Sequence, residues 1–191
     1  MALDDFMRQL ADAFCTTLEG RADQLASFHR HGVQVEGWLK GEMLLFLDQQ
    51  KDSGAIEGFD REVLAPLHDR RKRVDLKVSF GPPSSSETAL IELKHWVSEQ
   101  KGTAYKPGFY FGAKDDVGLY PDASALSSLA PDRAYLIVLV TANPGRQAWD
   151  AGVQKFNTKF GQPTLISLSD PNSFPDTFFL GLLKVTSKPL P

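Results

Sequence analysis

Residues 74–96 read VDLKVSFGPPSSSETALIELKHW, and this stretch decides the fold. From Val74 to Phe80 apolar and polar residues alternate, which is the pattern of a half-buried β-strand. The Gly-Pro-Pro-Ser-Ser-Ser segment that follows predicts a turn, because proline cannot donate a hydrogen bond to a sheet. A second strand is predicted over residues 88–96. The stretch therefore predicts a β-hairpin with a long loop.

Helical periodicity dominates before the hairpin, and mixed patterns follow it. Apolar residues recur at helical spacing over two N-terminal segments, which predicts helices over 3–28 (with Gly20 as a candidate interruption) and 33–50. Residues 51–60 read as a loop, and no strand is evident between residues 97 and 115. The rest of the chain predicts helices over 122–129 and 147–160, a buried strand over 134–141, and strands over 164–168 and 178–185.

This order predicts an α/β protein, with a mixed β-sheet flanked by helices. The length of 191 residues favours a single domain, with an N-terminal helical extension over about residues 1–30. The single cysteine, Cys15, cannot form an internal disulfide and reads as a small apolar residue of a helix. The N-terminus lacks the pattern of a secretory signal, and no apolar run approaches the roughly 18 residues of a membrane span. We therefore expect a cytoplasmic protein that does not enter a membrane.

The formal net charge of −3 argues against a protein that coats nucleic acid without specificity, since such domains are usually basic. It does not argue against a nuclease, because metal-binding carboxylates subtract charge. The four histidines are scattered and there is one cysteine, so no zinc site is predicted.

Four polar residues interrupt the apolar patterns. Glu92 and Lys94 are two residues apart in a strand, so both side chains point to the same face. Asp75 lies inside the preceding strand, where aspartate is disfavoured. On a helical wheel Glu42 falls in the middle of the apolar stripe of its helix, and a buried carboxylate needs a partner or a metal. Glu36 falls at the stripe's edge and reads as a solvated partner of Lys40, four residues on.

Asp75 in one strand, Glu92-Leu93-Lys94 in the next and Glu42 on the preceding helix resemble the PD-(D/E)XK superfamily of restriction-endonuclease-like nucleases. The resemblance covers about residues 33–142, and Val74 stands where the family's nominal proline would be. It implies a restriction-endonuclease-like core with the element order α-β-β-β-α-β.

The resemblance also implies a chemistry. Asp75, Glu92 and Glu42, with the backbone carbonyl of Leu93, are expected to bind Mg²⁺ or Mn²⁺, which prefer oxygen ligands. Lys94 is expected to position the attacking water or to stabilise charge on the phosphate. The expected activity is metal-dependent hydrolysis of phosphodiester bonds in DNA, in repair or in defence against foreign DNA, with RNA as a further candidate substrate.

Other interpretations remain open at this point. Asp75, Glu92 and Lys94 could form an ion-pair network on a solvated sheet face. The fold could also serve as a catalytically inactive module for nucleic-acid binding or protein assembly. No separate recognition domain is visible, so specificity could come from a homodimer or a partner protein. The charged run 69–73 is either a solvated loop or a phosphate-contacting patch, and the aromatic residues of 105–111 either close a core or stack on bases.

Overall fold

The computed structural model describes most of the chain. The described residues are 1–67, 70–97, 99–100, 103–104, 110–111, 118–129, 133–141, 146–160, 165–167 and 178–185. Within some of these elements only the backbone is described, for example at residues 70–72.

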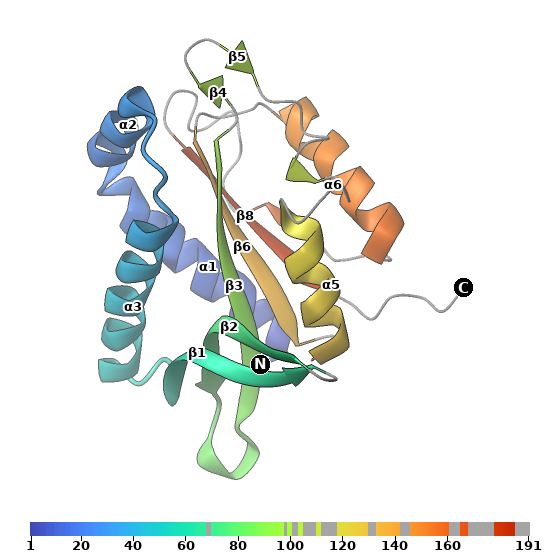
Figure 1. Ribbon diagram of the computed structural model, residues 1–191. Helices are drawn as coiled ribbons and strands as arrows, with labels where there is room; N and C mark the ends of the chain where they lie inside the picture. The colour runs from blue at the N-terminus through green and yellow to red at the C-terminus, as the bar shows by residue number, and fades with distance from the viewer. Residues whose placement is uncertain are drawn as a thin grey trace.

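A mixed six-stranded sheet forms the centre of the molecule (Figure 1). Its order is β1-β2-β3-β6-β8-β7, and β3 and β6 are its one parallel pair among the described strands. The strands are β1 (Gly58–Leu67), β2 (Arg70–Phe80), β3 (Glu87–Val97), β6 (Ala134–Thr141), β8 (Phe178–Val185) and β7 (Leu165–Ser167). A 3₁₀ turn, η1 (Pro83–Ser85), lies in the hairpin loop, and two short strands, β4 (Glu99–Gln100) and β5 (Thr103–Ala104), pair separately. The predicted α/β class is confirmed.

Helices cover both faces of this sheet (Figure 1). On one face lie α1 (Leu3–Glu19), α2 (Ala22–His31) and α3 (Glu36–Asp52), and on the other lie α5 (Leu119–Leu129) and α6 (Arg146–Phe160). The first predicted helix is thus two helices, which separate at Gly20 and Arg21. Among the described residues no helix has the length and apolar character to cross a membrane.

Two apolar clusters hold these layers together. The first lies between α1–α3 and the sheet and contains Phe14 and Ile137, and the second lies under α5 and α6 and contains Leu126 and Val138. Alternate residues of β6 enter opposite clusters, and every residue of this strand is buried. The apolar run that predicted a central strand is explained by this position, because a strand covered on both faces needs no polar side. The N-terminal helices share this core.

The N-terminal end of α1 is fixed to the sheet by polar contacts. The Asp4 carboxylate accepts hydrogen bonds from the Tyr135 hydroxyl on β6 and from the Lys184 ammonium on β8, the latter at 2.9 Å. Burial would raise the pKa of Asp4, but these two donors outweigh burial and hold the pKa below its ordinary value. This anchor connects the first helix to strands more than a hundred residues later in the chain.

The prediction of a loop over 51–60 was wrong at its end, because β1 begins at Gly58. The charged run is also not a loop where the structure describes it, since β2 begins at Arg70. Strand β1 therefore precedes the hairpin in the chain and adds a third strand beside it. It pairs with β2 from Gly58↔Ser79 to Leu67↔Arg70. This pairing is interrupted at Glu62, whose positive φ of 50° is rare for a residue with a side chain.

Candidate active site

Asp75 and Glu92 face each other where β2 begins to separate from β3. The regular pairing of the two strands ends at Leu76↔Ile91, and side chains then replace the backbone ladder. The Asp75 N–H donates to Glu92 Oε2 at 3.3 Å, and the Leu93 N–H donates to Asp75 Oδ2 at 2.9 Å. Each carboxylate is thus held by the backbone of the opposite strand. The two acids lie on adjacent strands, where the hairpin was expected to bring them.

The three residues that the sequence predicted on the two strands are shielded from solvent. The Asp75 side chain is 13% exposed, that of Glu92 7% and that of Lys94 17%. Side chains buried to this extent do not form a solvated ion-pair network on an exposed sheet face, which was the alternative interpretation of these three residues. Charged groups this deep require partners, and each of the three has them.

Lys94 lies among three carboxylates. Its Nζ is 3.0 Å from Asp122 Oδ2, 3.4 Å from Glu92 Oε1 and 3.8 Å from Glu36 Oε1. Burial alone would lower the pKa of Lys94, but the negative charges of Asp122, Glu92 and Glu36 outweigh it and raise the pKa well above its ordinary value. Lys94 is therefore a fixed positive charge at neutral pH.

Helix α3 contributes a second pair of charges. Lys40 Nζ lies 2.7 Å from Asp75 Oδ1 and 3.3 Å from Glu36 Oε1. The predicted pairing of Glu36 with Lys40 is confirmed, but Glu36 is not a surface residue that serves Lys40 alone, because it also reaches Lys94. Burial alone would lower the pKa of Lys40. The contacts with Asp75 and Glu36 outweigh burial and raise this pKa above its ordinary value.

Glu42 does not join this group, which corrects its predicted position. Its carboxylate Oε2 lies 3.4 Å from Nε of Arg21, and Arg21 is in the short connection between α1 and α2. Lys40 and Glu42 are two residues apart, and two residues turn an α-helix by about 200°. Since Lys40 faces Asp75, Glu42 faces nearly the opposite way. Glu36 is the helix carboxylate that the structure brings to the site.

Asp122 also belongs to the site, and the sequence did not single it out, whereas Tyr110, one of the aromatic residues of 105–111, lies close to Asp122. Asp122 lies in the first turn of α5, and the Tyr110 hydroxyl donates to the backbone carbonyl of His95 at 2.9 Å. Burial, with Glu36 and Asp122 nearby, raises the pKa of Tyr110 strongly. Gly118 precedes α5 with a φ of 95°, and an added Cβ there would collide with the Tyr110 carbonyl. That glycine allows α5 to begin close to Tyr110.

The aromatic residues near the site pack rather than project where the structure describes them. Tyr110 stacks on Trp96 with ring centroids 5.4 Å apart, and Phe111 is buried in the second cluster. This agrees with the core interpretation for these two. Residues 105–109 lie outside the described residues.

His95 points to the face opposite Lys94 and is buried in a network of its own. Its Nε2 lies 2.8 Å from Thr141 Oγ1, and its Nδ1 accepts a hydrogen bond from the Val35 N–H at 3.4 Å. Burial, and secondarily the nearby His29, lower the pKa of His95 to about 4. The neutral ring therefore ties the residue before α3 to β3 and β6, which helps to place Glu36 near Lys94.

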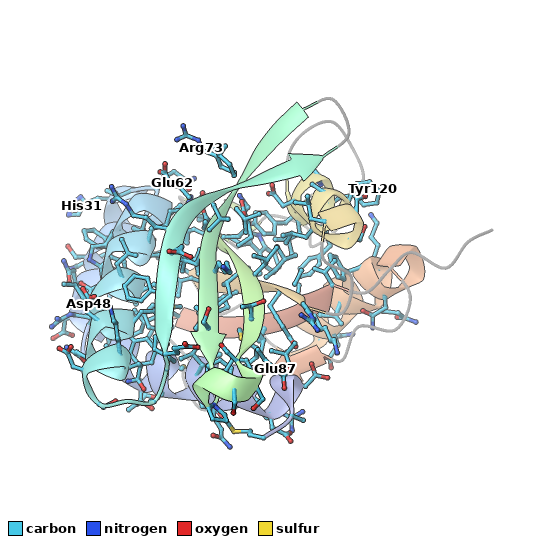
Figure 2. The ribbon with its side chains drawn as sticks, turned by 90° about the horizontal axis from the view of Figure 1, so that it is seen from below. His31, Asp48, Glu62, Arg73, Glu87 and Tyr120 are labelled. Atoms are coloured by element: carbon cyan, nitrogen blue, oxygen red, sulfur yellow. The ribbon has the colours of Figure 1, made fainter. Side chains whose placement is uncertain are left out.

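A pocket of about 260 Å³ opens beside Asp75. It is lined by α3, β1, β2 and β3, through Gly37, Lys40, Gly41, Leu44, Arg61, Glu62, Asp75, Leu76 and Leu93. On its β1 side, Glu62 pairs with Arg73 at 2.8 Å, and Figure 2 shows both on the outer side of the β1–β2 ribbon. Arg73 is the one residue of the charged run 69–73 whose side chain is described, and it is exposed. A larger pocket of about 590 Å³ lies elsewhere, at the hairpin turn.

The charges of the site suit a divalent cation. Four carboxylates (Glu36, Asp75, Glu92 and Asp122) face two ammonium groups (Lys40 and Lys94). The net charge of these six groups is therefore −2 when all of them are ionised. Carboxylate oxygens are the ligands that Mg²⁺ and Mn²⁺ prefer. Among the described residues no three acidic, histidine or cysteine side chains already form a cage for an ion, and the carboxylates pair with the lysines instead.

Comparisons with models of protein families, with curated proteins and with solved structures find no match to this chain.

Proposed function

We propose that this protein is a metal-dependent nuclease that hydrolyses phosphodiester bonds in DNA, built on a restriction-endonuclease-like core. The observation that carries the proposal is the pairing of Asp75 with Glu92 across β2 and β3, with Lys94 Nζ 3.4 Å from Glu92 Oε1. Two carboxylates and an ammonium group in a shielded site are the groups that metal-assisted phosphodiester hydrolysis requires.

The order of the elements gives independent support. Helix α3 is followed by β1, β2 and β3, then by the short separate pair β4 and β5, and then by α5 and β6. Apart from that separate pair, this is the α-β-β-β-α-β order that the resemblance to PD-(D/E)XK nucleases implies. The sheet order β1-β2-β3-β6, with β3 parallel to β6, brings Asp75 and the Glu92-Leu93-Lys94 segment to the same site.

Asp75 and Glu92 would hold Mg²⁺ or Mn²⁺, with the Leu93 carbonyl as a further oxygen ligand. Such an ion polarises the scissile phosphate and lowers the pKa of bound water. Glu36 takes the place that the sequence suggested for Glu42, because its carboxylate is the one beside Lys40 and Lys94.

Lys94 would stabilise the negative charge that develops on the phosphoryl oxygens. It is a poor candidate for the base that accepts a proton from water, because its carboxylate neighbours keep it protonated. Asp122, at 3.0 Å, is a positioning residue that fixes the direction of the Lys94 ammonium.

Cleavage assays with three variants test the proposal. Single-stranded, double-stranded and branched DNA and RNA are incubated with Mg²⁺ or Mn²⁺, with and without EDTA. The wild-type protein should cleave DNA only when metal is present. Asp75→Ala should lose metal binding and cleavage, and Lys94→Ala should keep metal binding but lose about 10²-fold or more in rate. The control is Asp60→Ala, which removes an exposed carboxylate of β1 that pairs with Lys77, and it should cleave like the wild type.

The outcomes separate the proposal from its alternatives. Equal cleavage by wild type and Asp75→Ala would reveal a contaminating nuclease and remove the support from activity. Absence of cleavage by the wild type on every substrate with both metals would refute the proposal. Retained DNA binding in that case, measured by fluorescence anisotropy, would identify an inactive nucleic-acid-binding module.

A further inference from the structure

Lys40 is the residue of the site whose position the proposed chemistry does not explain. It comes from α3, and its Nζ makes the shortest ion pair of the site, 2.7 Å to Asp75 Oδ1. The Lys40 side chain is 37% exposed, whereas Asp75 is 13% exposed. A half-buried lysine therefore covers a shielded carboxylate.

The two oxygens of Asp75 have different surroundings. Oδ2 accepts the Leu93 N–H at 2.9 Å, which ties it to the backbone of β3. Oδ1 contacts Lys40 and is the oxygen not bound to the backbone. Oδ1 is the oxygen that a cation can bind without sharing the lone pairs that hold the β2–β3 connection, and a positive charge already lies there. Like charges at such short range repel, so ammonium and metal compete for this oxygen.

We propose that Lys40 is the built-in counter-ion of the metal-free site, that its ammonium group leaves Asp75 Oδ1 when a divalent cation binds, and that it then contacts a phosphate of the nucleic acid. This inference rests on the proposed function and adds a residue to it. Lys40 neutralises Asp75 while the cation is absent, and it adds a positive charge to the substrate pocket when the cation is present.

The pocket has room for this movement. Lys40 lines it together with Gly37 and Gly41, which are one helical turn apart on α3. A Cβ added at either glycine would meet nothing within 4 Å among the described residues, so α3 leaves open space at these two positions. Arg61 lies on the β1 side of the same pocket, so a released Lys40 would share the pocket with a second cation.

Lys94 does not share these properties. Its side chain is 17% exposed and three carboxylates surround it. Its departure would leave Asp122 and Glu92 without this partner in a shielded site, which is costly. Lys94 stays while Lys40 exchanges.

Titration calorimetry of the intact protein with Mn²⁺, without nucleic acid, tests the exchange directly. Lys40→Met keeps the length and apolar stem of the side chain but removes the charge. It should bind Mn²⁺ about tenfold more tightly than the wild type, since one competing charge is gone. The control is Lys77→Met, because Lys77 has the same 37% exposure and pairs with a carboxylate, Asp60, outside the site. Lys77→Met should bind Mn²⁺ like the wild type.

The second arm measures binding of a DNA duplex in Ca²⁺ at several salt concentrations. Lys40→Met should bind DNA more weakly, and the slope of log affinity against log salt should fall by about one, the value for one lost phosphate contact. Tighter metal binding together with weaker DNA binding is the expected signature. Circular dichroism of each variant checks the fold, and Lys40→Arg, which keeps the charge, should bind Mn²⁺ no more tightly than the wild type.

The failures are distinguishable. If the wild type binds Mn²⁺ and Lys40→Met binds it equally or more weakly, the inference about Lys40 is wrong and the proposed nuclease stands. If neither protein binds Mn²⁺, the metal-dependent function and the inference both fail. An unchanged salt slope in Lys40→Met would refute the phosphate contact.

Discussion

Replacing the buried His95 by glutamine should make the stability of the protein less sensitive to acid. In the folded protein, burial and the nearby His29 lower the pKa of His95 from 6.5 to about 4. The buried ring lies between Thr141 on one side and the Val35 N–H and Gln34 Oε1 on the other, and a proton on Nδ1 would displace the hydrogen bond that Nδ1 accepts from Val35. In the unfolded chain the same ring titrates near its ordinary pKa.

The sign and size follow from these two pKa values. Between pH 6.5 and about 4 the unfolded chain binds a proton that the folded protein does not, so the free energy of unfolding falls as the pH falls. The difference of about 2.5 pKa units, at about 1.4 kcal/mol for each unit, corresponds to roughly 3 kcal/mol of stability lost between pH 7 and pH 4. The stability that comes from keeping His95 neutral is fully present above pH 6.5 and is lost as the pH falls to about 4. His95→Gln removes the titrating group, so its stability should fall by roughly 3 kcal/mol less over the same interval.

Urea unfolding at pH 7, 6, 5 and 4 measures this difference. Carboxylate titrations affect the wild type and His95→Gln alike, so they cancel when the two curves are subtracted. His31→Gln is the matched control, because His31 is an exposed histidine of α2, and its curve should parallel that of the wild type. Parallel curves for the wild type and His95→Gln would refute the reasoning. The absolute stability of His95→Gln at pH 7 does not enter this test, because only the change with pH is compared.

Two further predictions concern the site and its support. Glu36→Gln should lower the cleavage rate about tenfold or more, because Glu36 contacts both lysines of the site. Glu42→Gln, on a different side of α3, should keep a rate within about twofold of the wild type. Equal losses of rate for the two variants in a single-turnover assay would contradict the assignment of Glu36 to the site. Gly118→Ala should lower the free energy of unfolding by about 2–4 kcal/mol, because it combines an unfavourable φ with a collision with the Tyr110 carbonyl. Gly58→Ala, where a Cβ meets nothing within 4 Å, should change stability by less than about 1 kcal/mol, and similar urea midpoints for the two variants would contradict the explanation.

The hairpin was predictable because its pattern is local. Alternation along a strand decides which side chains share a face, so Glu92 and Lys94 could be placed together before any packing was known. Asp75 could be placed beside them because the turn at residues 81–86 returns the chain antiparallel to itself. The buried strand β6 was predictable for a similar reason, since an apolar run of this length between turn residues is typical of a strand covered on both faces.

Strand β1 was missed because its pattern is irregular. Asp60, Arg61 and Glu62 are consecutive charged residues, and Pro66 lies near the end of the strand. As the described edge of the sheet next to β2, this strand keeps an exposed side and needs no clean alternation. Its existence depends on pairing with β2, and pairing is a tertiary property.

By itself, the sequence determined which residues share a face within each element, because the periods of helix and strand are properties of the backbone. Only the tertiary structure decided which faces meet. The wheel of α3 carries Glu36 and Glu42 on different sides, and the packing of the helix turned Glu36 toward Lys94 and Glu42 toward Arg21. Asp122 reaches Lys94 because α5, which lies in the chain between β3 and β6, packs on one face of the sheet that these two strands form. Contacts of this kind join segments far apart in the chain, and no local period encodes them.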